Sequence, residues 1–165
     1  MSEPIGCNIS IHLPATWGTD TEKPAIVLLF ENALLRGGLI EPEPVPGTVG
    51  RVHWEIDGEG NYGLSDSEVE EGLDWLLEHK VPFIATDDTK YDLRGRIMHF
   101  DGVRQYDGRY DGDVVLCWED YEAIGRRTHT MYSTVDDYFT RLTRPLSDIT
   151  IGHLPTTPPP IIEEG

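Results

Sequence analysis

The stretch RVHWEIDGEGNYGLSDSEVEEGLDWLLEHKVPFIATDD, residues 51–88, decides the fold because a strand pattern and a helix pattern follow one another in it. In residues 51–57 apolar and polar side chains alternate, and successive side chains of a strand point to opposite faces. The apolar set is Val52, Trp54 and Ile56. This alternation predicts a half-buried strand.

Residues 64–80 of the same stretch have a helical period. Their apolar side chains recur at steps of three and four residues, which places them on one face of a helix. They are Val69, Leu73, Leu76 and Leu77. Ser65 and Glu68 have the spacing of a capping box at the start of this helix. Pro82 ends it, because proline cannot continue a helix, and residues 82–88 begin the next strand.

The preceding segments supply a strand, an apolar element and a loop. Residues 8–13 alternate apolar and polar, which predicts a strand. Residues 24–38 begin with proline and end with two glycines, as a helix does, although residues 25–30 alone would also suit a short buried strand. Residues 41–50 contain three prolines, which exclude a helix and an interior strand, so we expect an extended loop there.

The following segments predict a meander and a short helix. Residues 95–101 and 113–118 are apolar enough for two more strands, joined through Asp-Gly turns. Aromatic-Asp-Gly triplets occur in this region at residues 100–102, 106–108 and 110–112. Residues 133–142 predict a short helix that Pro145 stops.

Together these elements predict an α+β fold, with a mostly antiparallel sheet of four to five strands, two main helices and a short C-terminal helix. With 165 residues, the chain has the size of one domain. We expect this domain to span residues 1–152. Residues 153–165 contain a Pro-Pro-Pro run and predict a flexible proline-rich tail.

Acidic residues dominate the charge of the chain. The formal net charge is −17, and residues 55–122, with nineteen acidic and six basic residues, account for −13 of it. Such a potential repels nucleic acid and anionic lipid, and it attracts cations and basic protein surfaces. We therefore expect no direct nucleic-acid partner. The alternative is that the acidic surface serves solubility alone.

Two further features bear on location. The longest apolar run, residues 25–30, is too short to span a bilayer, so we expect no membrane partner. The two cysteines are far apart and no signal peptide precedes the first strand, which predicts a reducing cytoplasm.

The carboxylates expected to bind a partner lie mainly on the helix of residues 64–80. Four-residue steps place Glu70, Asp74 and Glu78 in one row with a spacing of about 6 Å, and like charges at this spacing repel. We expect the row to belong to a continuous negative surface that imitates a phosphate backbone; a solvated helix face is the alternative. The predicted partner-binding residues are Glu68, Glu70, Glu71, Asp74, Glu78, Asp87 and Asp88.

A second hypothesis assigns carboxylates to a divalent cation. Asp107, Asp111 and Asp113 could converge on Ca²⁺, which takes about six to eight oxygen ligands, although the segment lacks the register of an EF-hand. A small enzyme dependent on Mg²⁺ would use Asp87 and Asp88 together with Asp107 and Asp111. Phosphate-cradling and nucleophile motifs are absent from the sequence. The sequence therefore favours a binding protein without a metal or cofactor over an enzyme.

Residues 60–92, GNYGLSDSEVEEGLDWLLEHKVPFIATDDTKYD, resemble a segment of small uncharacterised acidic proteins of actinobacterial phages and plasmids. In these, a YGL entry leads to an acidic helix and then to a PF…DD.KY strand and loop. Residues 133–142, STVDDYFTRL, carry a similar resemblance. It covers about a third of the chain and implies an accessory protein of a mobile element, located in the host cytoplasm. It implies no activity and no functional residues.

These observations predict a non-enzymatic acidic protein that engages a basic protein surface, in its sharpest form a nucleic-acid-mimicking inhibitor of a host nucleic-acid-binding protein. The metal-binding domain or metal-dependent enzyme is the first alternative. The second is a structural or assembly subunit, in which Trp17, the proline-rich loop of residues 41–47 and the tail pack against other copies of the chain.

Overall fold

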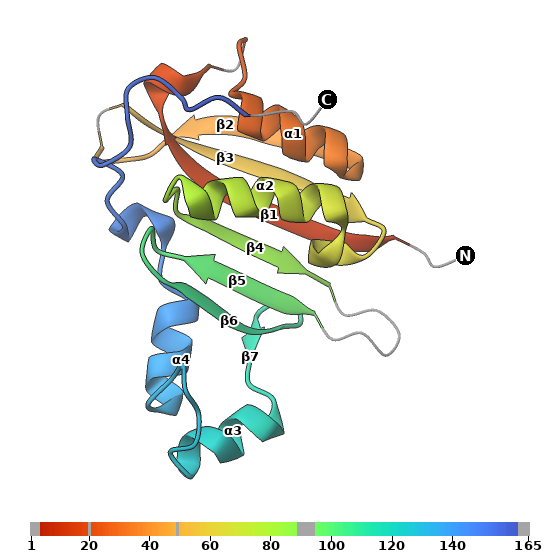
Figure 1. Cartoon of the computed structure of the whole chain (residues 1–165), viewed down its shortest axis with the longest axis vertical. Helices are drawn as coiled ribbons and strands as arrows, with labels where there is room; N and C mark the ends of the chain where they lie inside the picture. The colour runs from red at the N-terminus through yellow and green to blue at the C-terminus, as the bar shows by residue number, and fades with distance from the viewer. Residues whose placement is uncertain (1–3, 20, 49, 89–94, 162–165) are drawn as a thin grey trace.

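The computed structural model describes residues 4–19, 21–48, 50–88 and 95–161 (Figure 1). Within them, seven strands form one antiparallel sheet in the order β2-β3-β1-β4-β5-β6-β7. The strands are β1 (Ile5–Pro14), β2 (Leu35–Pro44), β3 (Arg51–Gly60), β4 (Phe83–Asp87), β5 (Arg96–Phe100), β6 (Gln105–Tyr110) and β7 (Val114–Val115). The α-helices are α1 (Ala25–Ala33), α2 (Ser67–Glu78), α3 (Trp118–Gly125) and α4 (Val135–Leu142). The 3₁₀ helices are η1 (Ala15–Trp17), η2 (Gly63–Ser65) and η3 (Leu146–Asp148).

The main core lies between the sheet and the pair α1 and α2, which cover one face of the central strands (Figure 1). Ile9 and Ile11 of β1 stand opposite Ile56 and Trp54 of β3, and all four side chains are 0% exposed. The alternation predicted from the sequence for these two strands is confirmed. Alternate side chains of the same strands point to the other face of the sheet.

The two helices of this layer pack closely because Gly72 of α2 leaves room for Phe30 of α1. A Cβ atom at position 72 would lie 2.6 Å from two ring atoms of Phe30. The predicted stripe on α2 is confirmed, with Leu77 only partly buried. The cap differs by one residue from the prediction, since the Asp66 side chain, not Ser65, accepts the N–H of Glu68.

The apolar segment of residues 25–30 is helical, but the helix is shorter than expected. It ends at Ala33 instead of Gly37-Gly38, and those glycines lie in β2. β2 is an edge strand that pairs with β3 through two irregular steps in register. Its prolines are compatible with an edge, where the N–H groups of one side need no partner strand. The expected loop of residues 41–50 is therefore a strand up to Pro44.

A second, smaller core lies on the opposite face of the sheet, over β5 and β6. Tyr138 and Leu142 of α4 pack there on Ile97 and Tyr106. The approach is close, because a Cβ atom at Gly108 would overlap Leu142 and lie 2.6 Å from the Tyr138 hydroxyl oxygen. The short helix predicted near the end of the chain is confirmed, although Thr134 rather than Ser133 caps it.

Two of the three aromatic-Asp-Gly triplets form turns, as expected. Asp101 accepts the N–H groups of Val103 and Arg104 between β5 and β6, and Gly112, at φ +72°, lies between β6 and β7. The middle triplet, residues 106–108, instead lies inside β6. This is one reason why the sheet has seven strands and not four to five.

Trp118 begins a helix instead of ending a strand. Only Val114 and Val115 of the expected strand pair with β6, and α3 follows with Glu119 and Asp120 in its first turn. Carboxylates there suit the positive end of the helix dipole. The α+β class and the antiparallel sheet are thus confirmed, with more strands and helices than the sequence predicted.

The described part of the proline-rich tail, residues 153–161, lies against the domain. Leu154 belongs to the main core. The indole N–H of Trp17 donates to the Pro155 carbonyl oxygen at 2.7 Å. Trp17 and the tail, which the assembly hypothesis placed against other copies, therefore contact each other within one chain. Among the described residues, no helix has both the length and the apolar composition to cross a bilayer.

Candidate functional site

A groove of about 700 Å³ runs between α1 and α2. Its α1 side is mainly aliphatic and includes Leu28, which is 42% exposed. Its α2 side is acidic. The lining residues are Ala25, Leu28, Leu29, Asn32, Ala33, Glu68, Glu71 and Ile161. The groove therefore combines one apolar wall with one negatively charged wall.

The five predicted carboxylates of α2 are all exposed. Glu68 and Glu71 line the groove, and the row of Glu70, Asp74 and Glu78 lies on the outer surface of the same helix. None of the five forms an ion pair with another described residue. Among the described residues, their negative charge therefore has no cationic partner.

Helix electrostatics account for some of these carboxylates and not for others. Glu68 and Glu70 lie in the first turn, where the helix dipole favours negative charge. Glu78 lies in the last turn, where the dipole disfavours it, and no basic residue is present there. Asp74 is four residues from both Glu70 and Glu78, so it adds two repulsive pairs. The stability of the helix therefore does not explain the carboxylates at positions 74 and 78.

Asp87 belongs to the interior and not to the exposed acidic surface on which we expected it. Its carboxylate is 4% exposed and accepts the backbone N–H groups of Leu64 at 3.0 Å and Arg96 at 2.7 Å. The Arg96 guanidinium adds an ion pair at 3.1 Å. Asp87 therefore ties the end of β4 to η2 and β5. Asp88, the next residue, points the other way and is exposed.

The candidate cation ligands do not come together. Among the described residues, no three His, Cys, Asp or Glu side chains form a group that could hold a metal ion. Asp107 instead accepts a hydrogen bond from Gln105, and Asp113 accepts the N–H of Val114 in the β6–β7 turn. With Asp87 bound to Arg96, the acids named for calcium or magnesium, Asp111 among them, build no shared site.

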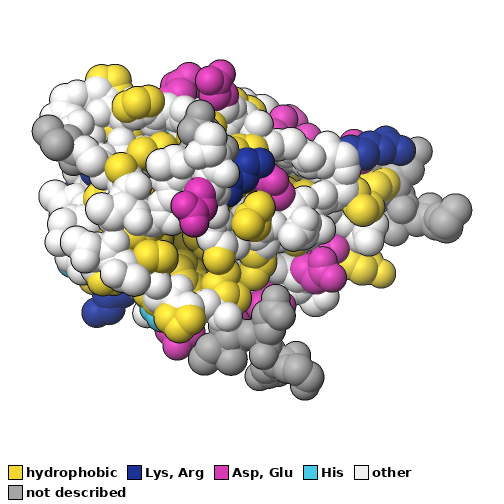
Figure 2. Space-filling model, turned by 90° about the horizontal axis from the view of Figure 1, so that it is seen from above, with side chains coloured by type: hydrophobic (Ala, Val, Ile, Leu, Met, Phe, Trp, Pro, Cys, Tyr) yellow, Lys and Arg dark blue, Asp and Glu magenta, His cyan; other side chains and the backbone are white. Residues whose placement is uncertain are grey.

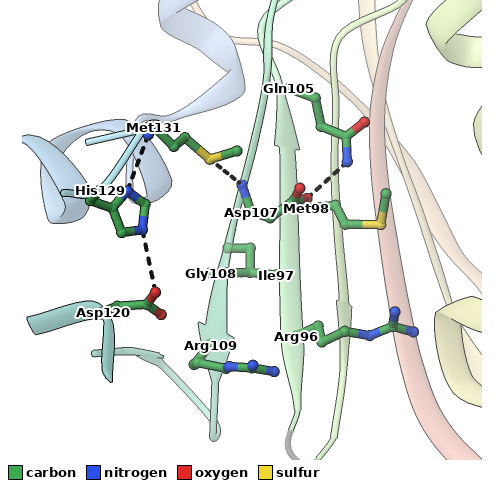
Figure 3. Close-up of a pocket in the computed structure, with 10 residues that line it drawn as sticks. All are labelled: Arg96, Ile97, Met98, Gln105, Asp107, Gly108, Arg109, Asp120, His129 and Met131. Atoms are coloured by element: carbon green, nitrogen blue, oxygen red, sulfur yellow. Dashed lines mark hydrogen bonds and ion pairs between the residues drawn. The ribbon is translucent and has the colours of Figure 1, made fainter. Parts of the chain in front are cut away.

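A second pocket, of about 490 Å³, lies beside β5 and β6 (Figure 3). Arg96 and Arg109 stand opposite each other on its sheet side, and His129 and Asp120 lie on the other side. His129 Nδ1 accepts two backbone N–H groups, so the proton is on Nε2, which lies 3.3 Å from Asp120 Oδ1. His129 has no free lone pair to take a proton from a substrate, and we assign no acid–base reaction to this pocket.

The two cysteines are poor nucleophiles at neutral pH. Burial and a hydrogen bond to Asp120 raise the pKa of Cys117, whose Sγ lies 2.9 Å from Asp120 Oδ2. Burial, followed by the charge of Asp87, raises the pKa of Cys7 to about 12. Both thiols therefore stay protonated.

A chain of hydrogen bonds crosses β1 and β3 on the face opposite α1 and α2. Arg51 Nε donates to His12 Nδ1 at 2.9 Å, so His12 carries its proton on Nε2 and donates it to His53 Nδ1 at 2.8 Å. The Arg51 guanidinium also donates to the carbonyl oxygens of Leu146 and Ile149. Burial, followed by the charges of Arg51 and His53, lowers the pKa of His12 to about 3. These polar groups satisfy one another and hold η3 to the sheet.

The acidic side chains do not form the continuous surface that we expected. Glu55 and Asp57 alternate with Trp54 and Ile56, so they lie on the face of the sheet opposite α2. Seen from above (Figure 2), the carboxylates form separate groups among apolar and polar side chains. The negative charge of the described residues is spread over several sides of the molecule, and the row on α2 is one of these groups.

Sequence reasoning missed the apolar half of the groove. The helix of residues 25–33 is apolar nearly all round, so no pattern distinguishes its exposed leucine, Leu28, from the buried ones. Ile161 is at least 90 residues away in sequence from every other lining residue, and only the fold brings it to the groove. Comparison with family models, curated proteins and solved structures gives no match for this chain.

Proposed function

We propose that this protein is a non-enzymatic binding protein whose α1–α2 groove engages a basic segment of a partner protein. The observation that carries the proposal is the composition of the groove. An aliphatic wall from α1 faces an acidic wall of Glu68 and Glu71, and neither carboxylate has a cationic partner among the described residues.

The matching ligand is an amphipathic segment with aliphatic side chains on one side and lysine or arginine on the other. The chain's own tail supports an aliphatic contact with the α1 wall, since Ile161 lines the groove. The row of Glu70, Asp74 and Glu78 extends the negative potential beyond the groove and would steer a cationic partner towards it.

A nucleic-acid mimic that inhibits a host factor is the narrower form of this proposal. It requires carboxylates along an extended path, whereas those outside α2 lie on other sides of the molecule. The proposal therefore rests on the groove and its adjoining row, with Glu68, Glu70, Glu71, Asp74 and Glu78 as binding residues and with Asp87 removed from the set.

The test uses a fluorescent helical peptide of leucine and lysine as the probe and measures its anisotropy with the full chain. We expect the double variant Glu68→Lys, Glu71→Lys to weaken binding about tenfold or more, because it reverses the charged wall. Binding to the unchanged protein should weaken as salt rises from about 50 to 200 mM.

The matched control is Asp57→Lys, Asp111→Lys. It changes the net charge by the same amount at exposed positions, one on the other face of the sheet and one in the β6–β7 turn. We expect it to bind the probe almost as well as the unchanged protein. Equal weakening in both double variants would mean that the probe senses net charge alone, and the groove would lose its role.

A further inference from the structure

Two tryptophan side chains hold the proline-rich tail through its carbonyl groups. Trp17 Nε1 donates to the Pro155 oxygen at 2.7 Å, and Trp75 Nε1 donates to the Pro160 oxygen at 3.4 Å. The chain bends at residues 156–157 between these two contacts. Each arm of the bent tail thus has one indole donor.

The tryptophans belong to an aromatic cluster at the edge of the main core, which the tail covers. The rings of Trp17 and Trp75 meet edge to face with centroids 6.2 Å apart, and His79 stacks at a tilt on Trp75 with a centroid distance of 4.4 Å. With the tail in place, Trp17 is 5% and Trp75 is 9% exposed. Three elements, η1, α2 and its C-terminal cap, contribute to the surface.

Aromatic side chains that carry an N–H donor suit the chemistry of proline-rich segments. Proline has no N–H, and the extended polyproline conformation has no internal hydrogen bonds, so its carbonyl oxygens remain free to accept. Aromatic side chains with a polar N–H can cover the pyrrolidine rings and donate to those oxygens, and the stiff ligand loses little entropy on binding.

We infer that the Trp17–Trp75–His79 surface is a recognition site for proline-rich segments, which the chain's own residues 155–160 occupy. Its ligand in a partner protein is a proline-rich segment followed by basic residues, which displaces the tail from the site. That the ligand carries basic residues rests on the proposed function of the α1–α2 groove. That it is rich in proline rests on the tryptophan contacts alone.

The charge of the tail argues for such an exchange. The tail reaches the groove at Ile161, and its sequence continues with Glu163 and Glu164. A segment with two lysines directly after the isoleucine would have the same proline contacts and the opposite charge. It would compete with the tail for the site.

The test follows the indole N–H signals by NMR in the full ¹⁵N-labelled chain, which has four tryptophans. The variant Pro158→Gly, Pro159→Gly, Pro160→Gly loosens the tail, and we expect the Trp75 signal to move. Adding the unlabelled peptide LPTTPPPIKK should return it towards its original position, while LATTAAAIKK should not. Trp54, which is 0% exposed, reports an intact core, and Trp118, which is 66% exposed, serves as the remote control.

The outcomes separate the two parts of the inference. If neither LPTTPPPIKK nor LPTTPPPIEE shifts the Trp17 and Trp75 signals of the tail variant, the proline-recognition site is refuted, whatever the groove binds. If both bind, with the lysine peptide about tenfold tighter at low salt, the whole inference is supported. Equal binding of the two peptides would keep the proline site and overturn the basic partner. The same titration with Trp75→Phe added, followed at the Trp17 signal, should show weaker binding of LPTTPPPIKK, because phenylalanine retains an aromatic ring and removes the donor to the Pro160 oxygen.

Discussion

The carboxylate of Asp87 and those of α2 come from one acidic stretch of sequence, yet they have opposite environments. Asp87 is 4% exposed and accepts hydrogen bonds from two backbone N–H groups and the Arg96 guanidinium. Glu71, Asp74 and their neighbours on α2 are exposed and have no cation among the described residues. Formal charge therefore says little about the charge available to a partner, because the fold first satisfies the acids that it buries.

Removal of the buried Asp87 carboxylate should have the largest effect on stability. We expect Asp87→Ala to lower the free energy of unfolding by about 2–4 kcal/mol, because it leaves the N–H groups of Leu64 and Arg96 without their acceptor at the end of β4. The estimate stays below that for a fully buried pair, since the Arg96 side chain is 38% exposed. Urea unfolding followed by circular dichroism measures the change.

The next residue provides the control. Asp88 has the same side chain but is exposed, and its backbone N–H bond to the Gly6 carbonyl survives substitution. Asp88→Ala should change the stability by no more than about 0.5 kcal/mol. A similar loss in both variants would show that Asp87 is no more structural than its neighbour.

Lowering the pH should test a second buried polar residue, His12. The pKa of His12 is lowered to about 3 in the folded protein, below the ordinary value of about 6.5 that applies on unfolding. The unfolded chain therefore binds a proton that the folded chain does not. The contribution of His12 to stability is complete above about pH 6.5, and it falls by up to about 1.4 kcal/mol per unit as the pH decreases towards 3.

His12→Gln isolates this effect, because the amide oxygen can still accept from Arg51. We expect the free energy of unfolding of the unchanged protein to decrease more steeply than that of the variant between pH 6.5 and about pH 5, where most carboxylates remain ionised. Parallel stability curves over this interval would contradict the lowered pKa of His12.

The sequence predicted correctly those elements in which the apolar residues follow a strand or helix period over the whole segment. The alternation of residues 51–57 and the helical stripe of α2 are of this kind. β2 has prolines and glycines in place of an alternating pattern, and as an edge strand it is held by β3 alone. β6 contains Gly108 for the approach of α4 and not for a turn, and sequence cannot distinguish those two uses of glycine.

The same limit applies to the candidate site. A helical period was sufficient to place the carboxylates of α2 on the surface. The burial of Asp87 was not predicted, although residues 82–88 were expected to form a strand and alternation from Phe83 and Ala85 puts Asp87 on the buried face. The groove and the tryptophan surface depend on residues such as Trp17, Leu28 and Ile161, which only the fold brings near α2.

Substitution of the exposed carboxylates of α2 should change the stability by a smaller amount. The double variant Asp74→Gln, Glu78→Gln removes the repulsion of Asp74 with Glu70 and Glu78, as well as an unfavourable charge at the C-terminal end of the helix dipole. We expect it to raise the free energy of unfolding by about 0.5–1 kcal/mol at low salt. In about 1 M salt, where the screening length is about 3 Å, most of the gain should disappear. A destabilised variant would mean that these carboxylates, like Asp87, are held by contacts within the chain, and α2 would then have no charge left over for a partner.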